Sequence, residues 1–237
     1  MTLINLPDAN CQSPETSCII SSKTKFPQIY LLSKIYYHFY NHKRIFMENQ
    51  PSRNEAYALL CEYNKQESLI RHGLAVEAVM RYFAEKSGED IEKWGAVGLC
   101  HDLDYEQFPD QHCTMTRKIL ETKNWPEAYI RAIVSHGWGI CSEVEPIEYM
   151  EKVLYATDEL TGLITACVYV RPSKSILDLT TKSVMKKWNT RAFAAGANRD
   201  VIAKGAEMLG IKVEELVEET ILAMQKGADA IGLKGNL

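Results

Sequence analysis

From residue 47 onward, the apolar residues recur with the spacing of an α-helix. The stretch ESLIRHGLAVEAVMRYFAEKSG at 67–88 shows this most fully, with apolar residues at 69, 70, 74, 76, 79, 80 and 83. These positions share one face of a helix that we expect to end at Gly88. No stretch alternates polar and apolar residues for long enough to predict a strand. The chain is therefore predicted to be all-α, a helical bundle buried on its apolar faces.

Other segments carry the end signals of helices. Ser52 and Glu55 form the pattern of a capping box. Pro126 suits the first position of a helix, and Gly137 suits its C-terminal cap. A longer helix is expected at 146–171. Three more helices are predicted towards the C-terminus, at 180–189, at 199–209 and from 213 onward.

The length and composition suit one domain that can bury a sizeable core. The chain has 237 residues, of which 46% are hydrophobic and 24% charged. We expect the domain at 47–237. Residues 1–46 lack the order of a signal peptide, and they are expected to be a poorly structured or loosely attached extension, unless Met47 is the natural start. A helix at 28–40 that packs on the domain is the alternative.

The charge and the cysteines exclude several classes. A net charge of −4 argues against a general nucleic-acid binder, which needs clustered Lys and Arg. No uninterrupted apolar run of about 18 residues is present, so no membrane span is expected. The 7 cysteines form no CxxC pair, which gives no signal of a thiolate zinc site or a disulfide framework. We expect reduced thiols in a cytoplasmic protein.

Histidines and carboxylates with metal-binding chemistry fall on successive helices. The stretch LCHDLDYEQ at 99–107 places His101 beside Asp102, and Asp158 lies on a largely apolar helix face. A buried carboxylate without a partner is costly, whereas a cation would neutralise it. Each histidine alone has an ordinary structural explanation, but the set predicts a metal site inside the bundle. The candidate ligands are His72, His101, Asp102, His112, His136 and Asp158. Nitrogen and oxygen donors suit one or two divalent ions of Fe, Mn, Zn, Co or Ni.

The order H…HD…D, formed by His72, His101–Asp102 and Asp158, resembles the HD-domain superfamily of metal-dependent phosphohydrolases. The resemblance covers residues 67–165. His112 and His136, between the doublet and the last aspartate, resemble the additional ligands of dinuclear members. The HD-GYP cyclic-dinucleotide phosphodiesterases and the inositol oxygenases share this broader pattern.

The resemblance implies a division of the ligands between two ions. It places His72, His101, Asp102 and Asp158 on the first ion. His112 and His136 would bind the second ion, with Asp102 as the bridge. Such ions activate water as a nucleophile and hold phosphate oxygens. Asp104 and Glu106 are candidates to exchange a proton with the leaving group or the water, although they can equally be solvated acids.

The chain departs from these relatives at two points. Tyr105 stands where HD-GYP proteins and inositol oxygenases have a lysine, and the GYP element is absent. A cyclic-dinucleotide phosphodiesterase is therefore not expected, and an inositol-type oxygenase would lack a substrate contact.

Basic residues gather in one late segment. Residues 171–200 contain seven Lys or Arg and only Asp178 and Asp200 as acids. If the segment folds over the metal cleft, it provides a positive field for an anionic substrate. Lys174 and Arg191 are the favoured phosphate contacts, with Arg71 as a third; a solvated helix face is the alternative.

The leading hypothesis is a metal-dependent phosphohydrolase that acts on a nucleotide or another small phosphoester through a metal-activated water. The expected partner is this small molecule, with no nucleic acid and no membrane, and a homodimer is possible. A di-iron oxygenase on the same scaffold and a non-catalytic ligand-binding module are the alternatives. A zinc protease is excluded because the chain has no HExxH motif.

Overall fold

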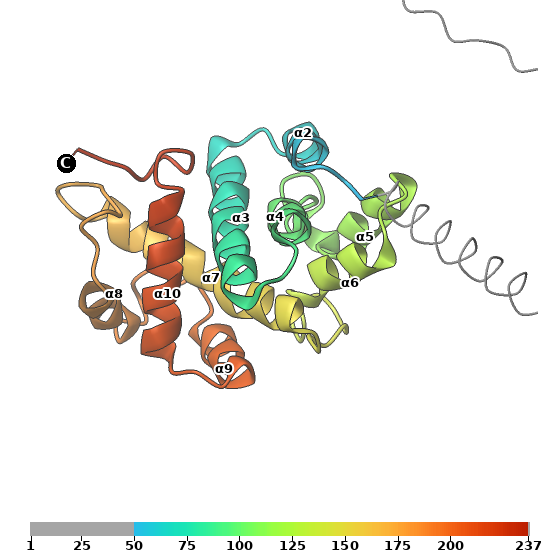
Figure 1. The fold of residues 1–237 in the computed structure, drawn as a ribbon. Coiled ribbons are helices and arrows are strands. Elements are labelled where there is room, and N and C mark those ends of the chain that lie inside the picture. The colour runs from blue at the N-terminus through green and yellow to red at the C-terminus, as the bar shows by residue number, and fades with distance from the viewer. Residues whose placement is uncertain (1–49, 237) are drawn as a thin grey trace, which may run out of the picture. The chain divides into compact units, whose positions relative to one another are not determined.

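The computed structural model describes residues 50–236, and its secondary structure is helical (Figure 1). The expectations for residues 1–46 lie outside this part of the chain. The helices are α2 (Arg53–Tyr63), α3 (Glu67–Ser87), α4 (Ile91–Cys100), α5 (Thr114–Thr122), α6 (Glu127–Ser135), α7 (Tyr149–Tyr169), α8 (Thr181–Trp188), α9 (Arg199–Leu209) and α10 (Val213–Lys226), with a short 3-10 helix, η1 (Pro109–Gln111). Residues 50–236 contain no strand, which confirms the all-α prediction. None of these helices is long and apolar enough to cross a membrane.

Local sequence signals set several helix ends. The predicted capping box is present: the Ser52 hydroxyl accepts from the backbone N–H of Glu55, whose carboxylate accepts from the Ser52 N–H. Gly88 ends α3 with a left-handed φ of 73°. Two expected signals were wrong by one residue. Pro126 is extended, with ψ of 140°, and precedes the first helical residue, while His136 rather than Gly137 is the C-terminal cap of α6.

Glycines let α3 and α4 pack closely. A Cβ at Gly73 would lie 3.3 Å from the carbonyl oxygen of Leu99, and a Cβ at Gly98 would lie 3.0 Å from the backbone nitrogen of Glu77. The close approach brings the His72 side chain of α3 to the C-terminal end of α4.

Helix α7 runs through the middle of the described helices and contacts α3, α6, α8, α9 and α10 (Figure 1). Its residues Leu154, Leu160 and Leu163 are fully buried. Gly205 allows α9 to pack directly on α7, because a Cβ there would lie 2.5 Å from the Cβ of Ala156. A buried helix with neighbours on several sides is a rigid support for any side chain that it presents.

The segment 171–180 is held by the C-terminal part of the chain. The Ile176 N–H donates to the carbonyl of Leu233 over 2.8 Å, and the Gln225 side chain donates to the carbonyl of Ile176. The Asn236 N–H donates to the carbonyl of Ser173 over 2.9 Å. These bonds fix the segment against α10 and the residues that follow it.

Candidate metal centre

The six predicted ligands come together from five stretches of the chain. His72 projects from α3, and Asp158 from α7. His101 and Asp102 follow the last residue of α4, and His112 follows η1. His136 is the C-terminal cap of α6. The donor atoms form two groups of possible metal ligands that share Asp102.

The first donor group contains His72, His101, Asp102 and Asp158. Nε2 of His72 lies 2.9 Å from Oδ1 of Asp158 and 3.1 Å from Nε2 of His101. Nε2 of His101 is 3.2 Å from the same Asp158 oxygen and 3.4 Å from Oδ2 of Asp102. Two imidazole nitrogens and two carboxylate oxygens therefore face one point.

The second donor group contains Asp102, His112 and His136. The Nε2 atoms of the two histidines lie 3.1 Å apart. Each of them is 3.4 Å from Oδ1 of Asp102. Asp102 thus turns one carboxylate oxygen to each group, which matches the bridging role that the family resemblance implies.

The opposite ring nitrogens are held by oxygen acceptors. Nδ1 of His101 donates to the carbonyl of Gly98 over 2.8 Å, and Nδ1 of His136 donates to the carbonyl of Ile133 over 2.6 Å. Nδ1 of His112 is 2.7 Å from Oδ1 of Asp104. Nδ1 of His72 is 3.4 Å from the hydroxyl of Thr161, whose own proton goes to the carbonyl of Asp158. In the neutral imidazoles, these bonds leave the Nε2 lone pairs for a cation.

The helix ends favour positive charge at the same place. His101 and His136 cap the C-termini of α4 and α6, where the unpaired carbonyls carry the negative end of the helix dipole. His101 is fully buried, and Asp102 and Asp158 are largely so. Two carboxylates and two helix C-termini around four imidazoles fit one or two divalent cations.

The ionisation of the centre is strongly coupled. Burial opposes the charged forms, yet the proximity of His101 holds the pKa of Asp102 and of Asp158 well below the usual range. The same carboxylates raise the pKa of His101. Against the effect of burial, the hydrogen bond to Asp104 and the charge of Asp102 raise the pKa of His112 to about 9. The metal-free centre therefore binds protons where the metal would bind.

A cavity of about 370 Å³ opens onto both donor groups. Its wall includes Tyr105, whose half-exposed ring stacks edge-on against His112 at 5.3 Å. It also includes Glu159, Gly196 and Val201, so the middle of α7, the loop before α9 and α9 itself close one side. The described wall residues include neither lysine nor arginine.

The two acids considered for proton transfer lie outside this wall. Asp104 is fully buried, and its two oxygens accept from His112 and from the backbone N–H of Thr116. Glu106 accepts from the backbone N–H groups of Lys65 and Gln66 over 2.6 and 3.0 Å. Asp104 thus fixes His112, and Glu106 fixes the loop between α2 and α3.

The three basic residues considered as phosphate contacts are spread over different places. Arg71 lines a neighbouring hollow of about 210 Å³, which shares His72 and Gly162 with the main cavity. Arg191 is exposed and pairs with Asp200 over 3.2 Å. Lys174 is exposed in the segment held by the C-terminal residues, and it lies on the wall of neither space.

Glu159 was not singled out from the sequence. It is half-buried beside Asp158, and its Oε2 accepts from the backbone N–H of Asn198 over 3.1 Å. Burial and the adjacent Asp158 charge raise its pKa. The only signal in the sequence was its position next to a predicted ligand, because the loop that completes its surroundings comes from the start of α9.

Comparison with known families agrees with this geometry. Residues 69–161 match the family model of the HD domain, and this stretch contains all six ligand residues. This part of the chain is therefore similar to the HD domain. This domain is typical of metal-dependent hydrolases, and the donor groups at 72–158 are able to hold the metal. Neither the search of curated proteins nor the search of solved structures gave a match.

Proposed function

We propose that this protein is a metal-dependent phosphohydrolase that acts on a small phosphorylated molecule, such as a nucleotide or another phosphoester. One observation carries the proposal: four imidazole nitrogens and two carboxylates converge in two groups at the wall of an open cavity. The match of residues 69–161 to the HD domain, which is typical of metal-dependent hydrolases, supports the proposal.

The residues divide into two ion sites in this proposal. His72, His101, Asp102 and Asp158 hold one divalent cation, while His112 and His136 hold another with Asp102 shared. When bound, such cations lower the pKa of a coordinated water and neutralise phosphate oxygens. The protein supplies rigid ligands and the cavity that positions the ester.

The composition of the cavity wall supports a small substrate held through its phosphate. The described wall residues include no Lys or Arg. In this proposal the cations therefore balance the negative charge of the phosphate. A volume of about 370 Å³ accommodates a nucleotide-sized molecule but no folded partner.

Two wall residues outside the donor groups are placed to contact the ester. The Tyr105 hydroxyl can donate a hydrogen bond to the substrate. Glu159 lies beside the first donor group, where its carboxyl group can exchange a proton with the leaving-group oxygen. Asp104 acts as a positioning residue through its bond to His112.

The experiment is a phosphate-release assay on metal-free protein reconstituted separately with Mn²⁺, Fe²⁺, Zn²⁺, Co²⁺ or Ni²⁺. The panel contains nucleoside monophosphates, cyclic nucleotides, sugar phosphates and p-nitrophenyl phosphate. We expect release with at least one metal, and none from His101→Ala. No release from any combination would contradict the proposal, and oxygen uptake by the iron form alone would favour the oxygenase alternative.

A further inference from the structure

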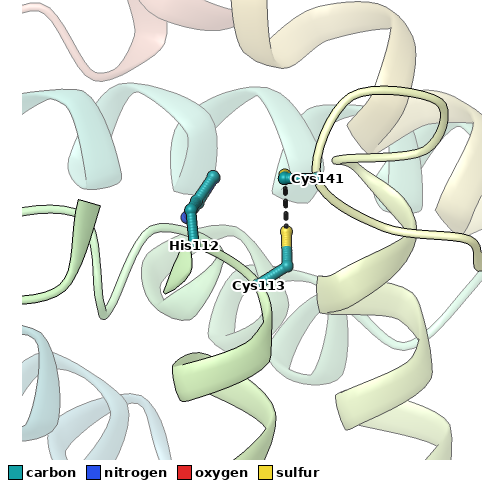
Figure 2. Close-up of side chains that lie close together, drawn as sticks. All are labelled: His112, Cys113 and Cys141. Atoms are coloured by element: carbon teal, nitrogen blue, oxygen red, sulfur yellow. Dashed lines mark hydrogen bonds between the residues drawn. The ribbon is translucent and has the colours of Figure 1, made fainter. Parts of the chain in front are cut away.

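A pair of cysteines lies directly behind the second donor group. Cys113 follows His112 and precedes α5, whereas Cys141 belongs to the loop after α6. Their sulfur atoms are 3.3 Å apart. Figure 2 marks this contact with a dashed line and shows His112 beside the pair. Among residues 50–236, the remaining cysteines, Cys61, Cys100 and Cys167, have no such sulfur contact.

A glycine makes room for the contact. A Cβ at Gly137 would lie 2.6 Å from the Cys113 sulfur and still closer to the Cys141 sulfur. Gly137 directly follows the predicted ligand His136. The two sulfurs therefore pack against the backbone just after the C-terminal end of α6. Any larger residue at 137 would force the sulfurs apart.

The backbone at Cys113 is strained. Its φ of 66° and ψ of −41° lie outside the ordinary regions for a residue with a Cβ. Strain of this kind persists only where the surrounding structure enforces it, and it is concentrated at functional sites. Here it turns the Cys113 side chain towards Cys141 while His112 faces the donor group.

The two thiols differ in access. Cys141 lines the cavity in front of the metal ligands and is partly exposed, whereas Cys113 is buried behind it. A small oxidant that enters the cavity therefore meets Cys141 first, with a second thiol already in contact to resolve the product.

We infer that Cys113 and Cys141 form a modification site, a thiol pair that a hydroperoxide converts reversibly to a disulfide. The Cys141 sulfur attacks one peroxide oxygen, the O–O bond breaks, and a sulfenic acid and one molecule of alcohol or water form. The Cys113 sulfur then attacks the sulfenic sulfur, the S–S bond forms, and water leaves. Overall, two thiols lose two electrons and two protons, and the hydroperoxide takes up both.

The disulfide also changes the second donor group. The sulfurs must close from 3.3 Å to the bond length of about 2.05 Å. This movement draws Cys113, which directly follows His112, towards the loop that contains Cys141 and follows His136. Metal–ligand distances lie within about 0.2 Å of standard values, so, in the proposed two-ion centre, a displaced ligand should make the oxidised protein bind the second cation more weakly.

The test uses the full chain in metal-free form. Reduced protein is treated with hydrogen peroxide, the excess is removed with catalase, free thiols are alkylated, and the digest is mapped by mass spectrometry. We expect the Cys113–Cys141 linked peptide to form before any other cysteine is modified and to disappear after reduction. Retention of both thiols, or oxidation of other cysteines first, would overturn the inference.

Two variants and one titration complete the test. Cys141→Ser should abolish the linkage, while Cys61→Ser, at a cysteine of similar exposure, should leave it unchanged. Titration with Mn²⁺ should show weakening of about tenfold or more for one ion in oxidised wild-type protein and no change in peroxide-treated Cys141→Ser. Equal Mn²⁺ binding before and after linkage would contradict the coupling to the second donor group.

Discussion

Oδ1 of Asp102 lies 3.4 Å from Nε2 of His136, and the other oxygen of the same carboxylate faces the opposite donor group. One side chain thus belongs to both groups. The adjacent His101 reaches only the first group, because its ring is tied back to the end of α4 by the carbonyl of Gly98. In the proposed two-ion centre, the His–Asp doublet would let a single turn of backbone serve both cations.

Asp104 is expected to act on metal binding through His112. Asp104→Asn removes the charge that holds Nδ1 of His112, so the affinity for the second ion should fall by about 10–100-fold while the first ion is retained. Metal titration of the variant measures this. Glu106→Gln is the matched control, because Glu106 bonds only to the α2–α3 loop. Equal loss in both variants would contradict a specific role of Asp104.

Metal affinity is expected to rise with pH. The pKa of His112 is raised to about 9 in the metal-free protein, so below that pH the ring carries a proton that a cation must displace. Each displaced proton lowers the apparent affinity by about tenfold per pH unit on the acidic side of its pKa. Titration with Mn²⁺ at pH 6, 7 and 8 should show progressively tighter binding; the same affinity at all three values would rule out this proton competition.

Glu159→Gln tests the role of Glu159, a residue of the cavity wall that was not among those predicted from the sequence. Since Glu159 lines the cavity but belongs to neither donor group, the variant should keep the wild-type metal content. Its kcat for phosphate release should fall by about 10²-fold or more, the usual contribution of a general acid or base. The fall in kcat should be smaller for a substrate with a good leaving group, such as p-nitrophenyl phosphate. Loss of metal together with activity would show a structural role instead.

Gly205 is expected to be essential for the contact between α7 and α9. Gly205→Ala places a Cβ 2.5 Å from that of Ala156, so the helices must separate, at a cost of about 1–3 kcal/mol in the free energy of unfolding. The control is Gly162→Ala on α7, where a Cβ meets nothing within 4 Å. That variant should be more stable by about 0.5–1 kcal/mol. Urea unfolding measures the stability of both variants. Equal stability of Gly205→Ala and Gly162→Ala would contradict the packing argument.

The fold was predictable because its signals are local. The 3.6-residue period of α3, the capping box at Ser52 and the terminal Gly88 each act within a few residues, and each is present as expected. The predicted ends of α6 were each wrong by one residue, because proline at the start of a helix and glycine at its end suit neighbouring positions almost equally well. At that end Gly137 is needed for the sulfur pair rather than for the cap.

The donor set was predictable because residue type and order limit its chemistry, whereas the surrounding contacts were not. The density of basic residues at 171–200 does not indicate which way each side chain points, and Lys174 lies with the C-terminal segment. Glu159 and Cys141 gain their surroundings from loops that are distant in sequence. Contacts of this kind depend on the packing of whole helices, which no local pattern encodes.

The most direct test of the two-ion centre is the metal content per chain, measured by mass spectrometry on protein purified without chelator and without a histidine-rich tag. The wild-type protein should contain two ions, His136→Ala one, and Asp102→Ala none, because only Asp102 belongs to both donor groups. Full metal content in Asp102→Ala would contradict the assignment of the centre.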